Sequence, residues 1–214
     1  MARIVAYEEG ALGTVKAVSE DGSLFLFKTS YLADSFAAAD LAGETISFPQ
    51  AIPFDIPDDV LAMALQATLA EGRALSLLAR AEQYRAGLER KLAMKDSSRF
   101  ACRVALDRLE AEGLLSDERY ADSWMRQRLR YRAEGPRSLS AALASRGVDR
   151  NAVKKAMASY FESEDHRDER LALIASAASR LLSREPDRRA VRMALLELGW
   201  RTGDVDDALD SLEP

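Results

Sequence analysis

Residues 139–160 read LSAALASRGVDRNAVKKAMASY, and this stretch decides the fold. Leu139 and Leu143 are four residues apart, so they share one face of a helix, and Gly147 can end that helix in the left-handed conformation. Asp149 is placed to cap a following helix, whose apolar residues recur at three- and four-residue spacing. Those apolar residues are Val153, Ala156, Met157 and Tyr160. The stretch therefore predicts two short helices joined by a tight turn.

This pattern occurs three times along the chain, at shifts of 51 and 52 residues. The matched positions are Leu88, Leu92, Asp96, Ala105, Leu106 and Leu109; Leu139, Leu143, Gly147, Ala156, Met157 and Tyr160; and Val191, Leu195, Gly199, Ala208, Leu209 and Leu212. Asp96 departs from the pattern because it stands where the other copies have Gly. The helix before each pair repeats as well, since Asp117-Glu-Arg-Tyr-Ala121 returns as Asp168-Glu-Arg-Leu-Ala172.

Each copy is interpreted as a three-helix repeat. In the second copy the first helix is predicted to begin at Ser116 or Asp117 and to bury Tyr120, Trp124 and Leu129 or nearby positions. Gly135-Pro136 separates it from the second helix. Because one repeat buries little by itself, the repeats are expected to stack into an elongated, curved array. The repeats are assigned to residues 58–115, 116–162 and 163–214.

Residues 1–57 are predicted to form a small β-rich segment that precedes the mainly α part of the chain. Thr14–Val18 and Leu24–Lys28 are rich in strand-forming residues, and Asp21-Gly22 between them is typical of a hairpin turn. Pro49, Pro53 and Pro57 follow, which favours a linker or an extended crossover. From Asp58 onward the spacing of apolar residues is helical, with Asp58 or Asp59 as the expected N-cap.

Composition excludes several classes of protein. No apolar run approaches the roughly 20 residues of a membrane-spanning helix, and acidic residues interrupt the first 30 positions where a signal peptide needs an apolar core, so we expect a cytoplasmic protein that does not enter membranes. One Cys (Cys102) and one His (His166) cannot form a disulfide, a Cys/His zinc site or a Cys–His dyad. Phosphate-binding loops and nucleophile elbows are absent from the sequence. We therefore expect no catalytic residues, no metal and no cofactor.

The net charge of −5 conceals an uneven distribution along the chain. Residues 1–72 carry −8, residues 73–161 carry +8 and residues 162–214 carry −5. A basic middle favours an anionic partner, either nucleic acid or an acidic protein surface. The alternative is that these Arg residues only cover a solvated helix face.

Two basic clusters are the candidate contact residues. The cluster of the second repeat contains Arg119, Arg126, Arg128, Arg130, Arg132 and Arg137. On a helix Arg119, Arg126 and Arg130 share one face, while Arg128 and Arg132 share another. Because only Asp122 and Glu134 are nearby, we do not expect both faces to be ion-paired locally. The cluster of the first repeat contains Arg85, Arg90, Lys91 and Lys95.

The residues that carry the repeat resemble a known family. Gly113-Leu-Leu-Ser-Asp-Glu-Arg-Tyr-Ala121 is the most specific element, and Leu88-Glu-Arg-Lys-Leu92, Gly135-Pro136 and Leu139, Leu143 and Gly147 accompany it. Together they resemble the RecX family of bacterial RecA regulators over residues 74–212, and Lys91 falls on the Lys of the second element. The chain differs from the family pattern at Tyr84, Gly87 and Asp96.

The resemblance implies a regulatory protein without chemistry of its own. It implies binding to RecA and to RecA filaments on single-stranded DNA, with restraint of filament extension or promotion of disassembly. ATP hydrolysis, strand exchange and the coupled DNA-damage response would be inhibited as a result. We expect a monomer with weak direct DNA binding at most. The competing hypothesis is a helical repeat module that binds nucleic acid without RecA.

Overall fold

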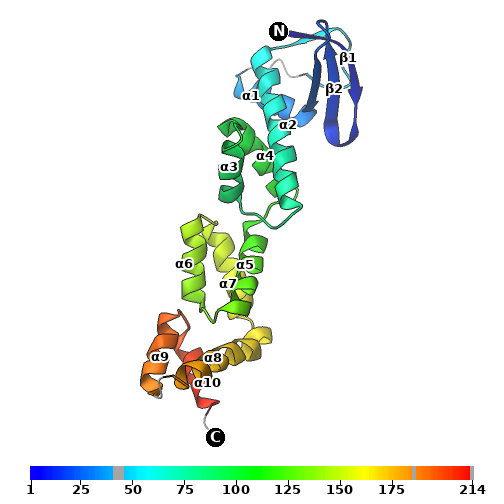
Figure 1. Ribbon diagram of the computed structural model, residues 1–214. Helices are drawn as coiled ribbons and strands as arrows, with labels where there is room; N and C mark the ends of the chain where they lie inside the picture. Colours follow the sequence, from blue (N-terminus) through cyan, green and yellow to red (C-terminus); the bar gives the residue numbers. More distant parts are fainter. Residues whose placement is uncertain (41–45, 185–186, 213–214) are drawn as a thin grey trace. The chain divides into compact units, whose positions relative to one another are not determined.

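The computed structural model describes residues 1–40, 46–184 and 187–212 of the chain (Figure 1). The chain forms two compact units, Met1–Leu115 and Ser116–Pro214. The fold is mainly helical, with a small antiparallel sheet in the first unit. Part of the expected β-rich segment, residues 41–45, lies outside the described residues.

The sheet has the strand order β3-β2-β1-β4, with every neighbouring pair antiparallel. The predicted hairpin is confirmed as β2 (Thr14–Ser19) and β3 (Leu24–Lys28), in which Thr14 pairs with Lys28. At its turn Gly22 has a φ of 84°, and the Asp21 carboxylate accepts hydrogen bonds from Ser19 and Ser23. The local turn sequence therefore positions this hairpin.

Three elements of the N-terminal segment were not predicted from the sequence: β1 (Ala2–Glu9), β4 (Phe54–Ile56) and α1 (Thr29–Ala38). The interpretation of the proline-containing stretch as a linker was wrong in part, because β4 lies between Pro53 and Pro57. This three-residue strand forms through its pairing with β1, in which Ile4 lies opposite Phe54. Prolines are tolerated there because β4 is an edge strand.

The first three-helix repeat consists of α2 (Asp58–Leu78), α3 (Arg85–Ala93) and α4 (Arg99–Ala111). Pro57 occupies the N-cap position of α2, one residue before the expected Asp58, and both aspartates lie in the first turn. A single apolar core runs from the sheet through α1 and α2 to α4. Cys102 belongs to this core, and burial raises the pKa of its thiol. The repeat is thus packed against the sheet layer of the same unit.

The second unit contains two further repeats. One consists of α5 (Asp117–Tyr131), α6 (Pro136–Arg146) and α7 (Arg150–Phe161). The other consists of α8 (Arg167–Leu182), α9 (Arg188–Glu197) and α10 (Thr202–Asp210), with the 3-10 turn η3 (Glu164–His166) before it. The predicted caps are confirmed, because Ser116 accepts a hydrogen bond from the Arg119 N–H and Asp149 from that of Ala152.

The backbone confirms the register of the repeats. Asp96, Gly147 and Gly199 end the second helix of each copy, and their φ angles are 58°, 86° and 91°. Asp96 therefore adopts the left-handed conformation that its Gly counterparts adopt at lower cost. Twelve matched apolar positions are buried: Leu88, Leu139 and Val191; Leu92, Leu143 and Leu195; Ala105, Ala156 and Ala208; and Leu106, Met157 and Leu209. The third copy diverges at Leu212, which is exposed.

The predicted core face of the first helix in the second repeat was wrong by one position. Ala121, Met125 and Leu129 are buried on α5, whereas Tyr120 and Trp124 are only half-buried. The helix is rotated so that its smaller side chains enter the narrow space between helices, and the large ring of Trp124 lies at the edge of the surface. Leu129 alone was assigned correctly.

The second and third repeats dock through two tight turns. The Gly135 N–H donates to the Leu198 carbonyl at 2.8 Å, and the Arg137 N–H donates to that of Gly199 at 3.2 Å. The Trp200 indole is buried, donates to the Ala133 carbonyl and packs edge-on against Phe161. A Cβ atom on Gly135 would lie 2.3 Å from the backbone of the opposite turn. Only glycine allows this approach.

Candidate functional site

A basic groove lies between α2 and α3 of the first repeat. We define the α2–α3 groove by its lining residues: Arg73, Ser76, Leu77, Arg80, Lys91, Leu92, Met94 and Lys95. Arg73 and Leu77 lie one turn apart on α2 and share a face, and Arg80 lies in the turn that follows this helix. Lys91 and Leu92 belong to α3, and Met94 and Lys95 directly follow it. The groove therefore arises where two helices of one repeat pack together.

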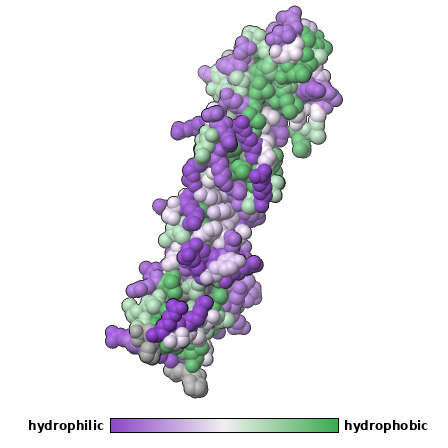
Figure 2. Space-filling model, in the orientation of Figure 1, coloured by the Kyte–Doolittle hydropathy of each residue, from purple (hydrophilic) through white to green (hydrophobic). Residues whose placement is uncertain are grey.

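The floor of this groove is apolar. Leu92 is buried, Leu77 is half-buried, and the Met94 side chain is 82% exposed. Figure 2 shows mostly hydrophilic side chains over the helices of the first repeat, with an apolar area among them. An exposed Met beside buried Leu residues offers an adaptable surface for an apolar ligand group.

The four cations of the groove form no ion pair with a carboxylate in the part of the chain that the structure describes. Arg73 donates to the Lys95 carbonyl at 2.7 Å and to the Ser97 hydroxyl at 3.2 Å. Lys91 donates to the neutral Gln83 amide oxygen at 2.6 Å. The Arg80 and Lys95 side chains are exposed. Within the described part of the first unit, no carboxylate is therefore paired with these cations.

The other two candidates of the first repeat interact elsewhere. Arg85 pairs with Asp107 at 2.5 Å and also with Glu110. Burial lowers its pKa, the two carboxylates raise it, and the net shift is upward. Arg90 lies over the Tyr84 ring and donates to its hydroxyl. Lys91 and Lys95 therefore line the groove, whereas Arg85 and Arg90 do not.

Arg73 and Arg80 are groove residues that the sequence interpretation missed. Their spacing of seven in the sequence, with Leu77 between them, was the available signal. This spacing does not reveal a groove by itself, because Lys91 and Lys95 come beside these arginines only through the packing of α3 against α2.

In the second repeat, Trp124 lies between two guanidinium groups. The guanidinium carbon of Arg128 is 5.4 Å from the centre of an indole ring, and that of Arg146 is 4.8 Å away. Tyr131, at the end of the same helix, is 81% exposed. We call Trp124, Arg128, Tyr131 and Arg146 the Trp124 face. Cation–π contacts hold the half-buried ring in place.

The expectation that the two arginine faces of α5 are not both ion-paired locally was wrong. The two carboxylate oxygens of Asp122 accept hydrogen bonds from the Arg126 Nε–H, at 3.0 and 2.9 Å. Glu134 accepts two hydrogen bonds from Arg128, at 2.9 and 3.0 Å, and lies 3.6 Å from Arg132. The bond to Glu134 raises the pKa of Arg128. Two carboxylates serve both faces because the loop after α5 folds back along the helix.

The remaining second-repeat candidates are exposed. Arg119 lies in the first turn of α5, Arg130 in its last turn, and Arg137 at the start of α6. Neither Arg130 nor Arg137 has an ion-pair partner among residues 1–40, 46–184 and 187–212. These two side chains are the cations of the cluster that remain available for an external anion.

The α2–α3 groove and the Trp124 face occupy matching places on their repeats. The shift of 51 residues converts Arg73, Leu77, Arg80 and Lys95 into Trp124, Arg128, Tyr131 and Arg146. Buried residues confirm this register, because Ala70 corresponds to Ala121 and Ala74 to Met125. The aligned residues of the third repeat are Ala175, Ser179, Leu182 and Leu198, which carry no charge.

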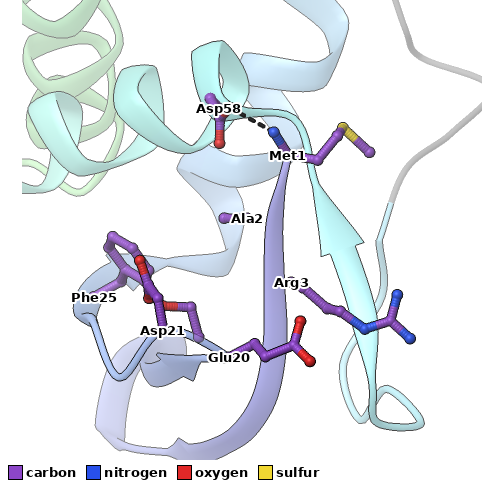
Figure 3. Close-up of a pocket in the computed structure, with 8 residues that line it drawn as sticks. Met1, Ala2, Arg3, Glu20, Asp21, Phe25 and Asp58 are labelled. Carbon is purple, nitrogen blue, oxygen red and sulfur yellow. Dashed lines mark hydrogen bonds and ion pairs between the residues drawn. The ribbon is translucent and has the colours of Figure 1, made fainter.

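A different pocket beside β1 has the opposite character. Glu20 and Asp21 from the β2–β3 turn line it, and Asp58 pairs with the N-terminal ammonium group (Figure 3). An acidic lining disfavours anions. Among the residues that the structure describes, no three His, Cys, Asp or Glu side chains gather where they could hold a metal ion.

Comparison with known proteins finds similarity to RecX proteins over part of the chain. The model of the second three-helix domain of RecX matches residues 116–157. "Regulatory protein RecX" of Pseudomonas putida (strain W619) is 40% identical over 87 residues, which is 39% of this chain and 53% of that protein. Part of this chain is therefore similar to RecX proteins. The RecX protein of Mycobacterium sp. (strain JLS) is 36% identical over 98 residues, 45% of this chain and 54% of its own length. The chain thus spans about half the length of the curated RecX relatives it matches.

Two solved RecX structures share the fold. A crystal structure of regulatory protein RecX superposes with a TM-score of 0.69 and 19% identity, covering 98% of this chain and 100% of that one. The crystal structure of RecX from Lactobacillus salivarius superposes with a TM-score of 0.60 and 21% identity. The match covers 69% of this chain and 96% of that one. These similarities establish the mainly helical RecX architecture. In the part of this chain that the structure describes, no helix is both long and apolar enough to cross a membrane.

Proposed function

We propose that this chain binds RecA and RecA filaments on single-stranded DNA and restrains filament extension or promotes disassembly. ATP hydrolysis, strand exchange and the coupled DNA-damage response are inhibited as a consequence. The observation that carries the proposal is the RecX match of the second repeat, together with curated relatives named as regulatory proteins. Regulation in this proposal occurs by binding rather than by catalysis, with a monomer acting in the cytoplasm.

The charge distribution supports the proposal. The first two repeats present cations at matching places, and Arg130 and Arg137 add cations that have no carboxylate partner among the described residues. A nucleoprotein filament offers phosphates and acidic side chains, and opposite charge accelerates association and fixes orientation.

The test is RecA ATPase activity on single-stranded DNA, titrated with this protein. We expect inhibition at concentrations of this protein below that of RecA, because a protein that restrains filament growth acts on many subunits at once. Unchanged ATPase activity, with filament length also unchanged in electron micrographs, would contradict the proposal.

A pair of charge-reversal variants locates the surface. Arg130→Glu with Arg137→Glu removes two exposed cations without breaking an ion pair of the described structure, and it should weaken inhibition by about tenfold. Arg180→Glu with Arg184→Glu changes the charge equally in the third repeat and should inhibit like the native protein. Equal inhibition by both variants would place the contact elsewhere.

A second candidate function is direct binding of nucleic acid, and the Trp124 face favours it. The exposed ring of Tyr131 can stack on a base, while Arg146, which lies beside the Trp124 ring, can contact phosphate. Binding of this kind needs no RecA and falls steeply as salt is added. A fluorescent oligothymidylate titrated at two salt concentrations, without RecA, distinguishes it from filament binding.

A further inference from the structure

The α2–α3 groove combines two properties that point to one class of ligand. Its rim carries four cations without a carboxylate partner in the described structure, and its floor is formed by Leu77, Leu92 and Met94. A ligand that satisfies both must carry several negative charges around an apolar group. A simple inorganic anion would contact only the cationic rim of this groove and would leave its apolar floor uncovered.

We propose that the α2–α3 groove binds an acidic peptide segment of a partner protein through one apolar anchor side chain. The anchor packs between Leu77 and Met94, and flanking carboxylates accept hydrogen bonds from Arg80, Lys91 and Lys95. This assignment rests on the proposed function, because it gives the chemistry of the segment that the partner supplies.

The groove favours a peptide over a nucleic acid. No aromatic ring lines it, so bases have nothing to stack on. A phosphate backbone also leaves the apolar floor unused. An acidic peptide instead buries its anchor on the floor while its carboxylates meet the rim, which is the usual arrangement of an apolar centre with a polar edge.

The cations of the rim are positioned and still charged. Arg73 is held by the Lys95 carbonyl and the Ser97 hydroxyl, which fixes the segment after α3 against α2. Lys91 is oriented by its hydrogen bond to the neutral amide oxygen of Gln83. Arg85 shows the contrast, because Asp107 and Glu110 already compensate it.

Among the described residues, the open groove with a cationic rim is a feature of the first repeat and is not repeated at the aligned places of the other two. At the matching place in the second repeat the indole of Trp124 lies under Arg128 and Arg146. In the third repeat the aligned residues are uncharged. One site per chain is expected.

The experiment measures binding of short labelled peptides to the full chain by fluorescence anisotropy, without RecA. The first probe has Glu and Asp on both sides of a Phe-Leu pair. The second has Ala-Ala in place of Phe-Leu, the third has Lys in place of every acidic residue, and the fourth is an oligothymidylate. We expect the first probe to bind about tenfold tighter than the second, and the third not to bind.

Two groove variants and a control assign the site. Arg80→Glu with Lys95→Glu should weaken the first probe by tenfold or more, and Met94→Asp should remove the preference for Phe-Leu over Ala-Ala. Each replaced side chain is exposed, so folding is retained and is verified by circular dichroism. Arg180→Glu with Arg184→Glu is the matched control and should bind the first probe normally.

Several results would overturn the assignment. They are equal binding of the Phe-Leu and Ala-Ala probes, unchanged binding after the groove variants, and tighter binding of the oligothymidylate that the groove variants abolish. Peptide binding and ATPase inhibition are separate measurements. A chain that inhibits RecA but does not bind the first probe refutes the groove and retains the proposed function, whereas the reverse result refutes the proposed function.

Discussion

Single residues set the ends of the helices in each repeat. Gly147 has a φ of 86°, a conformation in which a Cβ atom meets the adjacent carbonyl oxygen. Asp96 tolerates a similar angle in the first repeat, since Asp is one of the few residues with a side chain that adopts it. The repeat therefore requires a backbone conformation at this place rather than a particular side chain.

Gly147→Ala should lower the free energy of unfolding by about 1 kcal/mol, because the left-handed conformation becomes strained. The measurement is urea unfolding followed by circular dichroism. Gly203→Ala is the control, since Gly203 lies inside α10 with open space around its missing Cβ atom. That variant should be neutral or more stable by about 0.5–1 kcal/mol. Equal destabilisation by both substitutions would show that the left-handed turn is not the cause.

At the scale of elements, contacts between helices decide which charges remain available. Glu134 lies in the loop after α5 and neutralises Arg128 and Arg132, which the helical wheel places on another face from Arg126. The packing of α3 on α2 brings together four cations from these two helices and the turns that follow them. They are Arg73, Arg80, Lys91 and Lys95. Counting charges along one helix predicts neither the ion pairs of Glu134 nor the cationic groove, because the residues that complete each of them lie outside that helix.

The docking of the second and third repeats gives a prediction at this scale. In Gly135→Ala the new methyl group would overlap the backbone of Gly199 and Trp200, which cannot move as a side chain would. We expect a loss of about 1–3 kcal/mol and faster amide hydrogen exchange in α9 and α10.

Gly72→Ala serves as the comparison for this variant, because Gly72 lies within α2 with open space around the missing Cβ atom. It should leave exchange in α9 and α10 unchanged. If Gly135→Ala also leaves that exchange unchanged, the contact between the turns does not hold the two repeats together.

At the scale of the whole molecule, the chain divides at Leu115 and Ser116 into two compact units with separate apolar cores. The first unit contains the sheet and one repeat, and the second contains two repeats. A single repeat buries few residues, so each needs either the sheet layer or another repeat to stabilise it.

A fragment of residues 116–214 should therefore fold on its own. We expect helical circular dichroism and cooperative urea unfolding. A fragment of residues 163–214 should be much less stable, because Trp200 loses its packing against Phe161 and its hydrogen bond to Ala133. Equal stability of the two fragments, or failure of the longer one to unfold cooperatively, would contradict this division of the chain.

The sequence alone determined the elements whose causes are local. Apolar spacing, the caps Ser116 and Asp149, the turn at Gly147 and the hairpin at Asp21-Gly22 all depend on residues within a few positions of one another. Tertiary structure decided the rest. It created β4 through pairing with β1, rotated α5 so that Trp124 lies at the surface, and paired Arg126 and Arg128 with carboxylates. It also assembled the α2–α3 groove, because ion pairing and groove formation depend on which helices come into contact, and periodicity along one helix does not specify that.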